Sequence, residues 1–336
     1  MNIQAKKKVF SGVQPTGSLH LGNYIGALSV WVKEQDNFDG IYCVVDLHAL
    51  TIPEAIEPKV FHEKNWETVA MYLACGIDPN KSTIFIQSQV REHTELAWIL
   101  TCMTPMGWLE RMTQFKSKSG KQETVGTGLF TYPVLQAADI LLYDTEVVPV
   151  GEDQKQHIEI TRDIAQRFNQ MFGEVFVLPE AMIPKAGARI MGLDDPESKM
   201  SKSSAVKNAK HAIGVVDEPK KIIKAIKAAK TDSASEVSFE GEMSPGVKNL
   251  LTIHHVMTGW DEAQQRAHFE GKGYGFFKSE IADAVVERLS PIREEYTRLL
   301  DDRAHLQAIA RMGAEKAGAQ AEAKVKAVKD ALKINF

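Results

Sequence analysis

The sequence is poor in cysteine and has no apolar segment long enough to cross a bilayer. Its 336 residues include three cysteines, Cys43, Cys75 and Cys102, which lie far apart in apolar stretches. This pattern favours buried thiols in a reducing compartment over disulfides or a zinc site. The first residues show no apolar core of a signal peptide. We therefore expect a cytoplasmic protein with no membrane partner and no metal site of its own.

The chain also lacks an excess of positive charge, because its formal net charge is −4. This balance argues against a wholly basic nucleic-acid binder but leaves room for local basic surfaces. The apolar fraction of 44% and the charged fraction of 25% are ordinary for a globular protein. The length is sufficient for two domains, one of them with a large core.

Strand-like and helix-like segments alternate through the first half of the chain. Continuous apolar runs, typical of strands covered on both faces, occur at 41–45, 82–87 and 147–150. Helical patterns lie between and after them, at 58–76, 93–103, 130–143 and up to about 172. This alternation predicts an α/β fold with a doubly wound, mostly parallel, Rossmann-like sheet.

The second half of the chain, from about residue 205, contains no convincing strand and predicts an all-helical C-terminal domain. We expect a catalytic domain over 1–204, a helical domain over 205–296, and C-terminal helices over 297–336 that pack back on the catalytic domain. The first helix of this half carries Lys220, Lys221, Lys224, Lys227 and Lys230. These lysines form either a solvated helix face or a surface that contacts phosphate groups.

Residues 10–26 predict a strand, a tight turn and a helix start. His20 and Asn23 are three residues apart and therefore share one helix face, from which Gly22 removes bulk. The free N–H groups at a helix N-terminus favour an anion such as phosphate. The stretch matches neither a Walker loop nor G-x-G-x-x-G. It is either an anion site or a Gly-rich turn with a surface His20.

Polar residues follow several of the predicted strands, where ligands bind in open parallel sheets. Gln14, Asp46, His48 and Gln87 stand at three strand ends, and the residues 151–154 follow a fourth. His48 taken alone is more often structural than catalytic, although its position favours a role in the site. Glu152 and Asp153 also suit the first turn of a helix for electrostatic reasons alone.

The helix predicted over 130–143 is almost wholly apolar and is therefore expected to be buried. Its polar residues, Tyr132, Gln136, Asp139 and Tyr143, form one stripe at spacings of four, three and four. A buried carboxylate needs a donor, so Asp139 meets either a protein donor or a ligand donor. We favour a ligand, a flat ring that carries an N–H or O–H group, over a satisfied core network.

Two lysine-bearing segments lack any apolar period and are expected to be loops. The first, 114–128, contains Lys118, and the second contains Lys199 and Lys202. Ammonium groups on loops can neutralise charge on a triphosphate, although ordinary solvated loops are the alternative. The second segment reads Lys-Met-Ser-Lys-Ser at 199–203.

Together these segments resemble the class I aminoacyl-tRNA synthetases of the tryptophanyl and tyrosyl group. His20-Leu21-Gly22-Asn23 resembles their HIGH signature, and residues 199–203 match the KMSKS signature at every position. Further similar segments lie at 10–17, 22–28, 46–51, 110–116, 137–143 and 150–157, so the resemblance covers nearly the whole chain. It is closest to the bacterial tryptophanyl branch.

The resemblance implies a role for each matching residue. Asp139 would accept the indole N–H of tryptophan beside Gln136, while Tyr132 and Gln154 would hold its ammonium group near His48. The catalytic groups would be His20, Asn23, Lys118, Lys199 and Lys202. The ATP site would comprise Gln14, Pro15, Thr16, Gly22, Asn23, Gly151, Glu152, Asp153, Ile190, Lys199, Met200, Ser201, Lys202 and Ser203.

The implied activity is the ATP-dependent charging of tRNA(Trp) with L-tryptophan by a homodimer, with Mg²⁺ carried by the nucleotide phosphates. Gln136 stands where several relatives have Met, which raises the alternative of a tyrosyl enzyme. Ser204-Ala205 replaces the Asp-Pro that often follows KMSKS. A non-catalytic RNA-binding paralogue is the alternative from another class, although His20, Lys199 and Lys202 argue against it.

Overall fold

The computed structural model describes residues 6–17, 19–115, 125–151, 154–182, 189–201, 208 and 210–335. The chain divides into two compact units. Unit 1 comprises residues up to 16, 31–184 and 302–336, and unit 2 comprises 17–30 and 185–301. Among the helices of the described part, none is long and apolar enough to span a membrane.

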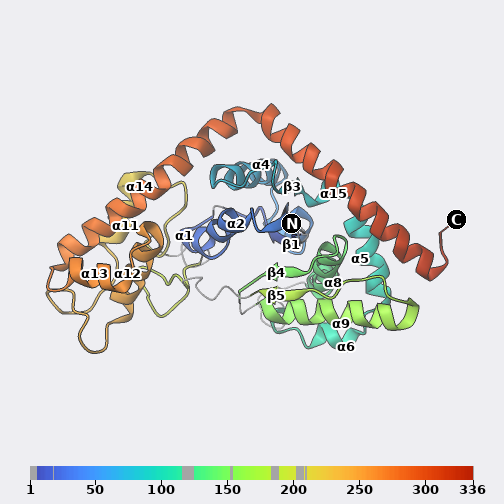
Figure 1. Ribbon diagram of the computed structural model, residues 1–336, viewed down its shortest axis with the longest axis horizontal. Helices are drawn as coiled ribbons and strands as arrows, with labels where there is room; N and C mark the ends of the chain where they lie inside the picture. The colour runs from blue at the N-terminus through green and yellow to red at the C-terminus, as the bar shows by residue number, and fades with distance from the viewer. Residues whose placement is uncertain are drawn as a thin grey trace, which may run out of the picture. The chain divides into compact units, whose positions relative to one another are not determined.

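Unit 1 is built on a parallel sheet of five strands (Figure 1). The strands are β1 (Lys7–Val13), β2 (Phe38–Val44), β3 (Thr83–Ile86), β4 (Val147–Pro149) and β5 (Glu180–Met182). Their order is β3-β2-β1-β4-β5, and every neighbouring pair is parallel. The order reverses its direction between β1 and β4, and ligands bind beyond the carboxyl ends of the strands at such a point. The predicted α/β fold with a doubly wound sheet is therefore confirmed.

Helices pack against this sheet because the strands are apolar on both faces. The helices of unit 1 are α3 (Asp46–Ala49), α4 (Pro58–Ala74), α5 (Glu92–Met103), α6 (Met106–Glu110), α8 (Thr127–Leu141), α9 (Lys155–Phe172) and α15 (Arg303–Leu332). Phe85 of β3, Val134 of α8 and Phe168 of α9 belong to one core cluster, each essentially inaccessible to solvent. Burial of such side chains stabilises each helix by about 1.5–3 kcal/mol per residue.

The C-terminal helix α15 packs against β3, α4 and α5. Ala317, Ala321 and Val325 of this helix join the core cluster of the sheet. Its approach to the strand is close, since a β-carbon at Gly313 would lie 1.8 Å from the carbonyl oxygen of Ile84. Only glycine permits this contact, which accounts for a residue that is unfavourable inside a helix.

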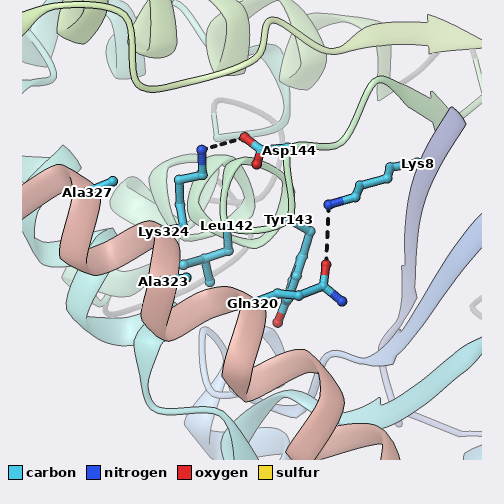
Figure 2. Close-up of a pocket in the computed structure, with 8 residues that line it drawn as sticks. All are labelled: Lys8, Leu142, Tyr143, Asp144, Gln320, Ala323, Lys324 and Ala327. Atoms are coloured by element: carbon cyan, nitrogen blue, oxygen red, sulfur yellow. Dashed lines mark hydrogen bonds and ion pairs between the residues drawn. The ribbon is translucent and has the colours of Figure 1, made fainter. Parts of the chain in front are cut away.

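A cavity of about 270 Å³ remains between α15 and the end of α8 (Figure 2). Two polar contacts border it: Lys8 Nζ donates to Gln320 Oε1 over 3.4 Å, and Lys324 Nζ lies 2.5 Å from Asp144 Oδ1. Tyr143 lines one wall (Figure 2). The cavity contains none of the predicted site residues and is a packing gap beside α15.

Unit 2 is helical, apart from isolated bridges in its described residues. Its elements are α1 (Leu21–Asn23), the π-helix η1 (Tyr24–Leu28), α11 (Pro219–Lys227), α12 (Pro245–Thr258), α13 (Glu262–Phe269) and α14 (Tyr274–Asp301), and α2 (Ser29–Glu34) follows η1. α14 packs against both α11 and α12. Arg288 Nε of α14 donates to the Tyr24 hydroxyl over 3.0 Å, which ties the 20–28 segment to the helices of this unit.

Most predicted elements are confirmed within a few residues of their expected ends. The strand β5 was not predicted, because three residues, two of them half-buried, give no clear apolar period. Residues 302–336 group with the sheet, where the C-terminal helices were expected to pack, whereas residues 17–30 and 185–204, expected in the catalytic domain, group with the helices up to residue 301. The functional assignment of the domains stays a prediction.

Candidate active site

Asp139 is the centre of a buried polar network in unit 1. It lies on α8 with 1% of its surface exposed. His48 Nε2 lies 2.7 Å from Oδ2, while Gln87 Nε2 and His93 Nδ1 each lie 2.6 Å from Oδ1. With Nδ1–H of His93 donating to the carboxylate, its Nε2 accepts the hydroxyl proton of Tyr143 over 2.7 Å. The protein therefore supplies three hydrogen-bond donors to the buried Asp139 carboxylate on α8.

The network keeps Asp139 ionised. Burial acts to raise the pKa of its carboxyl, but the electrostatic attraction of His48 and the hydrogen bonds from His48 and His93 outweigh burial and hold the pKa well below its ordinary value. The carboxylate lies at the level of two strand ends, because His48 follows β2 and Gln87 follows β3. Such a fixed negative acceptor can recognise a ligand N–H or O–H group.

Tyr132 lies two helical turns before Asp139 on α8 and belongs to a second hydrogen-bonded group. Nε2 of His157, on α9, lies 2.8 Å from its hydroxyl, which donates to Gln114 Oε1 over 3.4 Å. Burial raises the pKa of Tyr132 to about 12, so the hydroxyl stays protonated at neutral pH. The rings of His48 and Tyr132 meet edge to face with centroids 6.4 Å apart, which joins the two groups.

The other predicted residues of unit 1 lie at strand and helix ends. Gln14 and Thr16 are exposed after β1, and Pro15 between them is buried. Gly151 is exposed after β4, and Gln154 is the residue before α9. Gln136 is half-buried on α8, in the stripe of Tyr132 and Asp139. These positions agree with the expected edge of the sheet, and the roles of the residues stay predictions.

His20, Gly22 and Asn23 form the start of α1 in unit 2. The side-chain oxygen of Asn23 accepts the backbone N–H of His20 over 3.1 Å, as in a capping box. A β-carbon at Gly22 would lie 3.1 Å from the His20 ring and 3.8 Å from Cβ of Ile190. Gly22 therefore lets His20 and Ile190 approach one backbone segment. The following π-helix is a form often found at functional sites.

Residues 190–200 form a short hairpin in unit 2, which we call the 190–200 hairpin. Met191 pairs with Lys199 in an antiparallel bridge, and the N–H of Met200 donates to the Ile190 carbonyl over 3.0 Å. Ile190 and Met200 are buried, with 3% and 1% of their surface exposed, whereas Lys199 is exposed. Ser201 follows and is half-buried. The burial of Ile190 leaves little of its side chain for a stacked base.

Five predicted site residues lie outside the described residues. They are Lys118, Glu152, Asp153, Lys202 and Ser203. Within the described ranges, no group of three or more His, Cys, Asp or Glu side chains could hold a metal ion.

Gln87, His93, Tyr143 and His157 contribute to the two networks but were not predicted as site residues. Gln87 and Tyr143 carried a signal, since one stands at a strand end and the other belongs to the stripe on α8. His93 carried none, because its contact with Asp139 depends on how α5 packs against α8. His157 lies in a segment of family resemblance, but only the fold shows its contact with Tyr132.

Known proteins are similar to this chain over most of its length. Residues 1–290 match the family model of class I tRNA synthetases for tryptophan and tyrosine. The tryptophan–tRNA ligase of Wolinella succinogenes is 53% identical over 97% of this chain and 98% of its own length.

Two solved structures are also similar over nearly the whole chain. The tryptophanyl-tRNA synthetase of Campylobacter jejuni, solved with ADP and tryptophan, has a TM-score of 0.84 and 38% identity, covering 97% of this chain and 99% of that one. The tryptophanyl-tRNA synthetase of Mycoplasma pneumoniae has a TM-score of 0.87 and 34% identity, covering 98% of both chains.

Proposed function

The chain belongs to the class I tRNA synthetases of the tryptophan and tyrosine group, and we infer that it ligates tryptophan to tRNA(Trp). It activates L-tryptophan with ATP to form tryptophanyl-adenylate and pyrophosphate, and then transfers the tryptophanyl group to the 3′ end of the tRNA. The observation that carries this function is 53% identity to a tryptophan–tRNA ligase over 97% of the chain.

Asp139 recognises the indole N–H of tryptophan. A carboxylate offers about four acceptor positions, and the described protein donors use three of them. The remaining position, on Oδ2, suits the indole nitrogen, which can only donate. An ionised acceptor makes this hydrogen bond stronger than a neutral one.

Tyr132 and Gln154 hold the ammonium group of the amino acid, and His48 orients Asp139. The protonated state of the Tyr132 hydroxyl and its bond to His157 support this role, because they fix the oxygen as an acceptor for an ammonium N–H. Gln136 lies on the same stripe and borders the ring. Because position 136 carries an amide in place of the Met of several relatives, tyrosine is the competing substrate.

ATP binds at the residues that the family resemblance implies. Gln14, Pro15, Thr16 and Gly151 supply the strand-end contacts, together with Glu152 and Asp153. Gly22, Asn23, Ser201 and Ser203 complete the nucleotide contacts, and the capping role of Asn23 supports a rigid helix start there. Ile190 and Met200, whose side chains are buried, border this site through their backbone. Mg²⁺ enters as the counterion of the phosphates, that is, as part of the substrate.

Catalysis consists of positioning and charge stabilisation, and no side chain acts as a covalent nucleophile. The tryptophan carboxylate attacks the α-phosphate in line, and the bond from that phosphorus to the bridging oxygen breaks to release pyrophosphate. His20, Asn23, Lys118, Lys199 and Lys202 stabilise the charge that develops on the phosphates. Each preorganised donor of this kind contributes about 3–4 kcal/mol.

The tRNA binds through lysines of α11, among other contacts. Lys220, Lys224 and Lys227 are exposed on this helix and line an open groove of about 540 Å³. Ile223 lies between them on the same face. A row of ammonium groups on a chain of net charge −4 favours a phosphate backbone as its partner. Lys221, in contrast, forms an ion pair with Asp217 over 2.7 Å.

The chain forms a homodimer in the cytoplasm. Exposed apolar side chains on α5 and α6 support the dimer: Trp98 and Met106 have 70% and 67% of their surface exposed, and Cys102, one turn after Trp98 on α5, is also exposed. The three cysteines are free thiols, which suits a reducing compartment.

Charging of tRNA tests the complete function. Purified protein, Mg-ATP and labelled tryptophan are incubated with tRNA(Trp), and acid-precipitable label is measured against a control with tRNA(Tyr) and labelled tyrosine. Label on tRNA(Trp) alone supports the function. Label on tRNA(Tyr) alone would assign the tyrosyl activity instead, and no label on either would leave the RNA-binding paralogue.

A further inference from the structure

The 190–200 hairpin, which carries Lys199, is fixed at its base by backbone pairing. Besides the bridge between Met191 and Lys199, the N–H of Gly192 donates to the Ser198 carbonyl over 2.8 Å. This pairing aligns the two arms with one another but does not by itself fix them to the rest of unit 2. Backbone bonds attach the turn, since the N–H of Leu193 donates to the His211 carbonyl over 3.0 Å and its carbonyl accepts the N–H of Lys230 over 2.7 Å. Side chains from elsewhere in the unit attach the two arms.

Asn249 of α12 attaches the first arm. Its Oδ1 accepts the N–H of Met191 over 2.9 Å, and its Nδ2 donates to the Met191 carbonyl over 3.0 Å. Asn249 is buried, with 5% of its surface exposed. The side-chain amide of Asn249 thus bonds both backbone groups of Met191, as a neighbouring strand would. Such groups are costly to leave without partners when they are buried.

His211 attaches the second arm and the turn. Its Nδ1 lies 2.6 Å from Asp194 Oδ1, and its Nε2 lies 3.3 Å from the carbonyl oxygen of Lys199. The short contact is a hydrogen bond from Nδ1–H to the Asp194 carboxylate. The imidazole lies directly on Gly192, where a β-carbon would be 2.2 Å from the ring. The close packing and the two hydrogen bonds leave the second arm little freedom.

We propose that Asn249 is a positioning residue for Lys199, which acts through the 190–200 hairpin. The proposal rests on the proposed function, because it presumes that the Lys199 ammonium stabilises the phosphates. Asn249 acts on Lys199 through its bonds to Met191 and the bridge from Met191 to Lys199. A misplacement of about 1 Å in a reacting group costs roughly 100-fold in rate, so loss of the two hydrogen bonds should slow activation.

Asn169 provides a matched control for this proposal. It is also an asparagine that fixes a loop through the backbone: its Oδ1 accepts the N–H groups of Val175 and Phe176, and its Nδ2 donates to the Phe176 carbonyl. That loop carries no predicted site residue. Replacement of either asparagine by alanine should lower stability, but only replacement of Asn249 should lower the rate of activation. This difference separates positioning from general structural support.

The test compares Asn249→Ala, Asn249→Asp and Asn169→Ala with the unaltered chain in tryptophan-dependent exchange of pyrophosphate into ATP. We expect Asn249→Ala to lower kcat about 10- to 100-fold while the KM for tryptophan changes less than twofold. Asn249→Asp has nearly the same size and keeps the acceptor for Met191 N–H, so it should fold and show an intermediate loss. Asn169→Ala should keep kcat within twofold.

A double-variant cycle tests whether the effect passes through Lys199. If it does, Asn249→Ala should change kcat by less than twofold in a chain that already carries Lys199→Ala. Equal losses in both backgrounds, or equal losses from Asn249→Ala and Asn169→Ala, would overturn the proposal. Failure of the proposed function is a different outcome, because the unaltered chain would then show no exchange with tryptophan.

Discussion

Nε2 of His48 lies 2.7 Å from Oδ2 of Asp139, so an imidazole on α3, shortly after β2, meets a carboxylate in the last turn of α8. This contact and those of Gln87 and His93 stabilise the negative charge of Asp139, although only 1% of the surface of this residue is exposed. An isolated charge there would cost several kcal/mol. The donors make the site possible, and they also define the direction from which a ligand N–H can approach.

Replacing the central carboxylate tests its role in recognising tryptophan. Asp139→Asn keeps the size of the side chain but removes its charge and one acceptor oxygen. Hydrogen bonds to charged groups contribute about 1.5–3 kcal/mol, so we expect the KM for tryptophan in pyrophosphate exchange to rise roughly 10- to 100-fold, with the KM for ATP little changed. Asp163→Asn, at an exposed position on α9, is the control. An unaltered KM for tryptophan would remove Asp139 from the site.

The stability of unit 2 should depend on pH through His254. Gln265 Nε2 lies 3.1 Å from its Nδ1, and burial, with the nearby His268, lowers its pKa to about 4. The folded chain therefore binds fewer protons here than the unfolded chain, whose histidine titrates near pH 6.5. The contribution of His254 is complete above that pH and is lost as the pH falls towards 4.

Urea unfolding at pH 7, 5.5 and 4.5 measures this dependence. The free energy of unfolding should fall with pH less steeply for His254→Gln than for the unaltered chain, because glutamine does not titrate. Parallel slopes in the two proteins would show that His254 is not the group responsible.

The lysines of α11 should govern the salt dependence of tRNA binding. The triple variant Lys220→Gln, Lys224→Gln, Lys227→Gln should bind tRNA(Trp) more weakly, and its plot of log affinity against log salt should be shallower by up to about two to three. Lys221→Gln, whose lysine is paired with Asp217, should change the slope much less. Tryptophan-dependent pyrophosphate exchange should be unchanged in both. An unaltered slope in the triple variant would place the tRNA contacts on another surface.

A charge on the exposed apolar surface of α5 should disrupt the dimer. Sedimentation of Trp98→Glu should reveal monomers at concentrations where the unaltered chain is dimeric, because the carboxylate would be desolvated in the interface. Met171→Glu, at an exposed apolar residue of α9 with 52% of its surface accessible, should stay dimeric. Dissociation by the second variant only would move the interface to α9.

The sequence predicted those features of the site that depend on a single helix or strand. The helical period placed Tyr132, Gln136 and Asp139 on one face of α8, and burial required a partner for the carboxylate. The identity of the partners could not be predicted, since His93 and Gln87 reach Asp139 only through the packing of α5 and the order of the strands. The sequence left open whether a protein donor or a ligand donor meets Asp139, and we favoured the ligand; the protein supplies three donors, and the bond to a ligand stays a prediction.

The helix start at residues 20–23 illustrates the same limit in unit 2. Its spacing predicted that His20 and Asn23 share a face, but Asn23 also caps the backbone of His20, a local bond that no periodicity reveals. The attachment of Met191 by Asn249, 58 residues further along, had no signal in the sequence. Long-range polar contacts of this kind depend on tertiary packing. The hydrophobic pattern of a sequence predicts single elements but not how they pack.

Exchange of pyrophosphate into ATP, measured with tryptophan and with tyrosine in parallel, shows whether the chain activates tryptophan. It isolates adenylate formation from every tRNA contact and identifies the amino acid that the Asp139 site accepts. We expect rapid exchange with tryptophan and little with tyrosine. Exchange with tyrosine alone, or with neither amino acid, would contradict it.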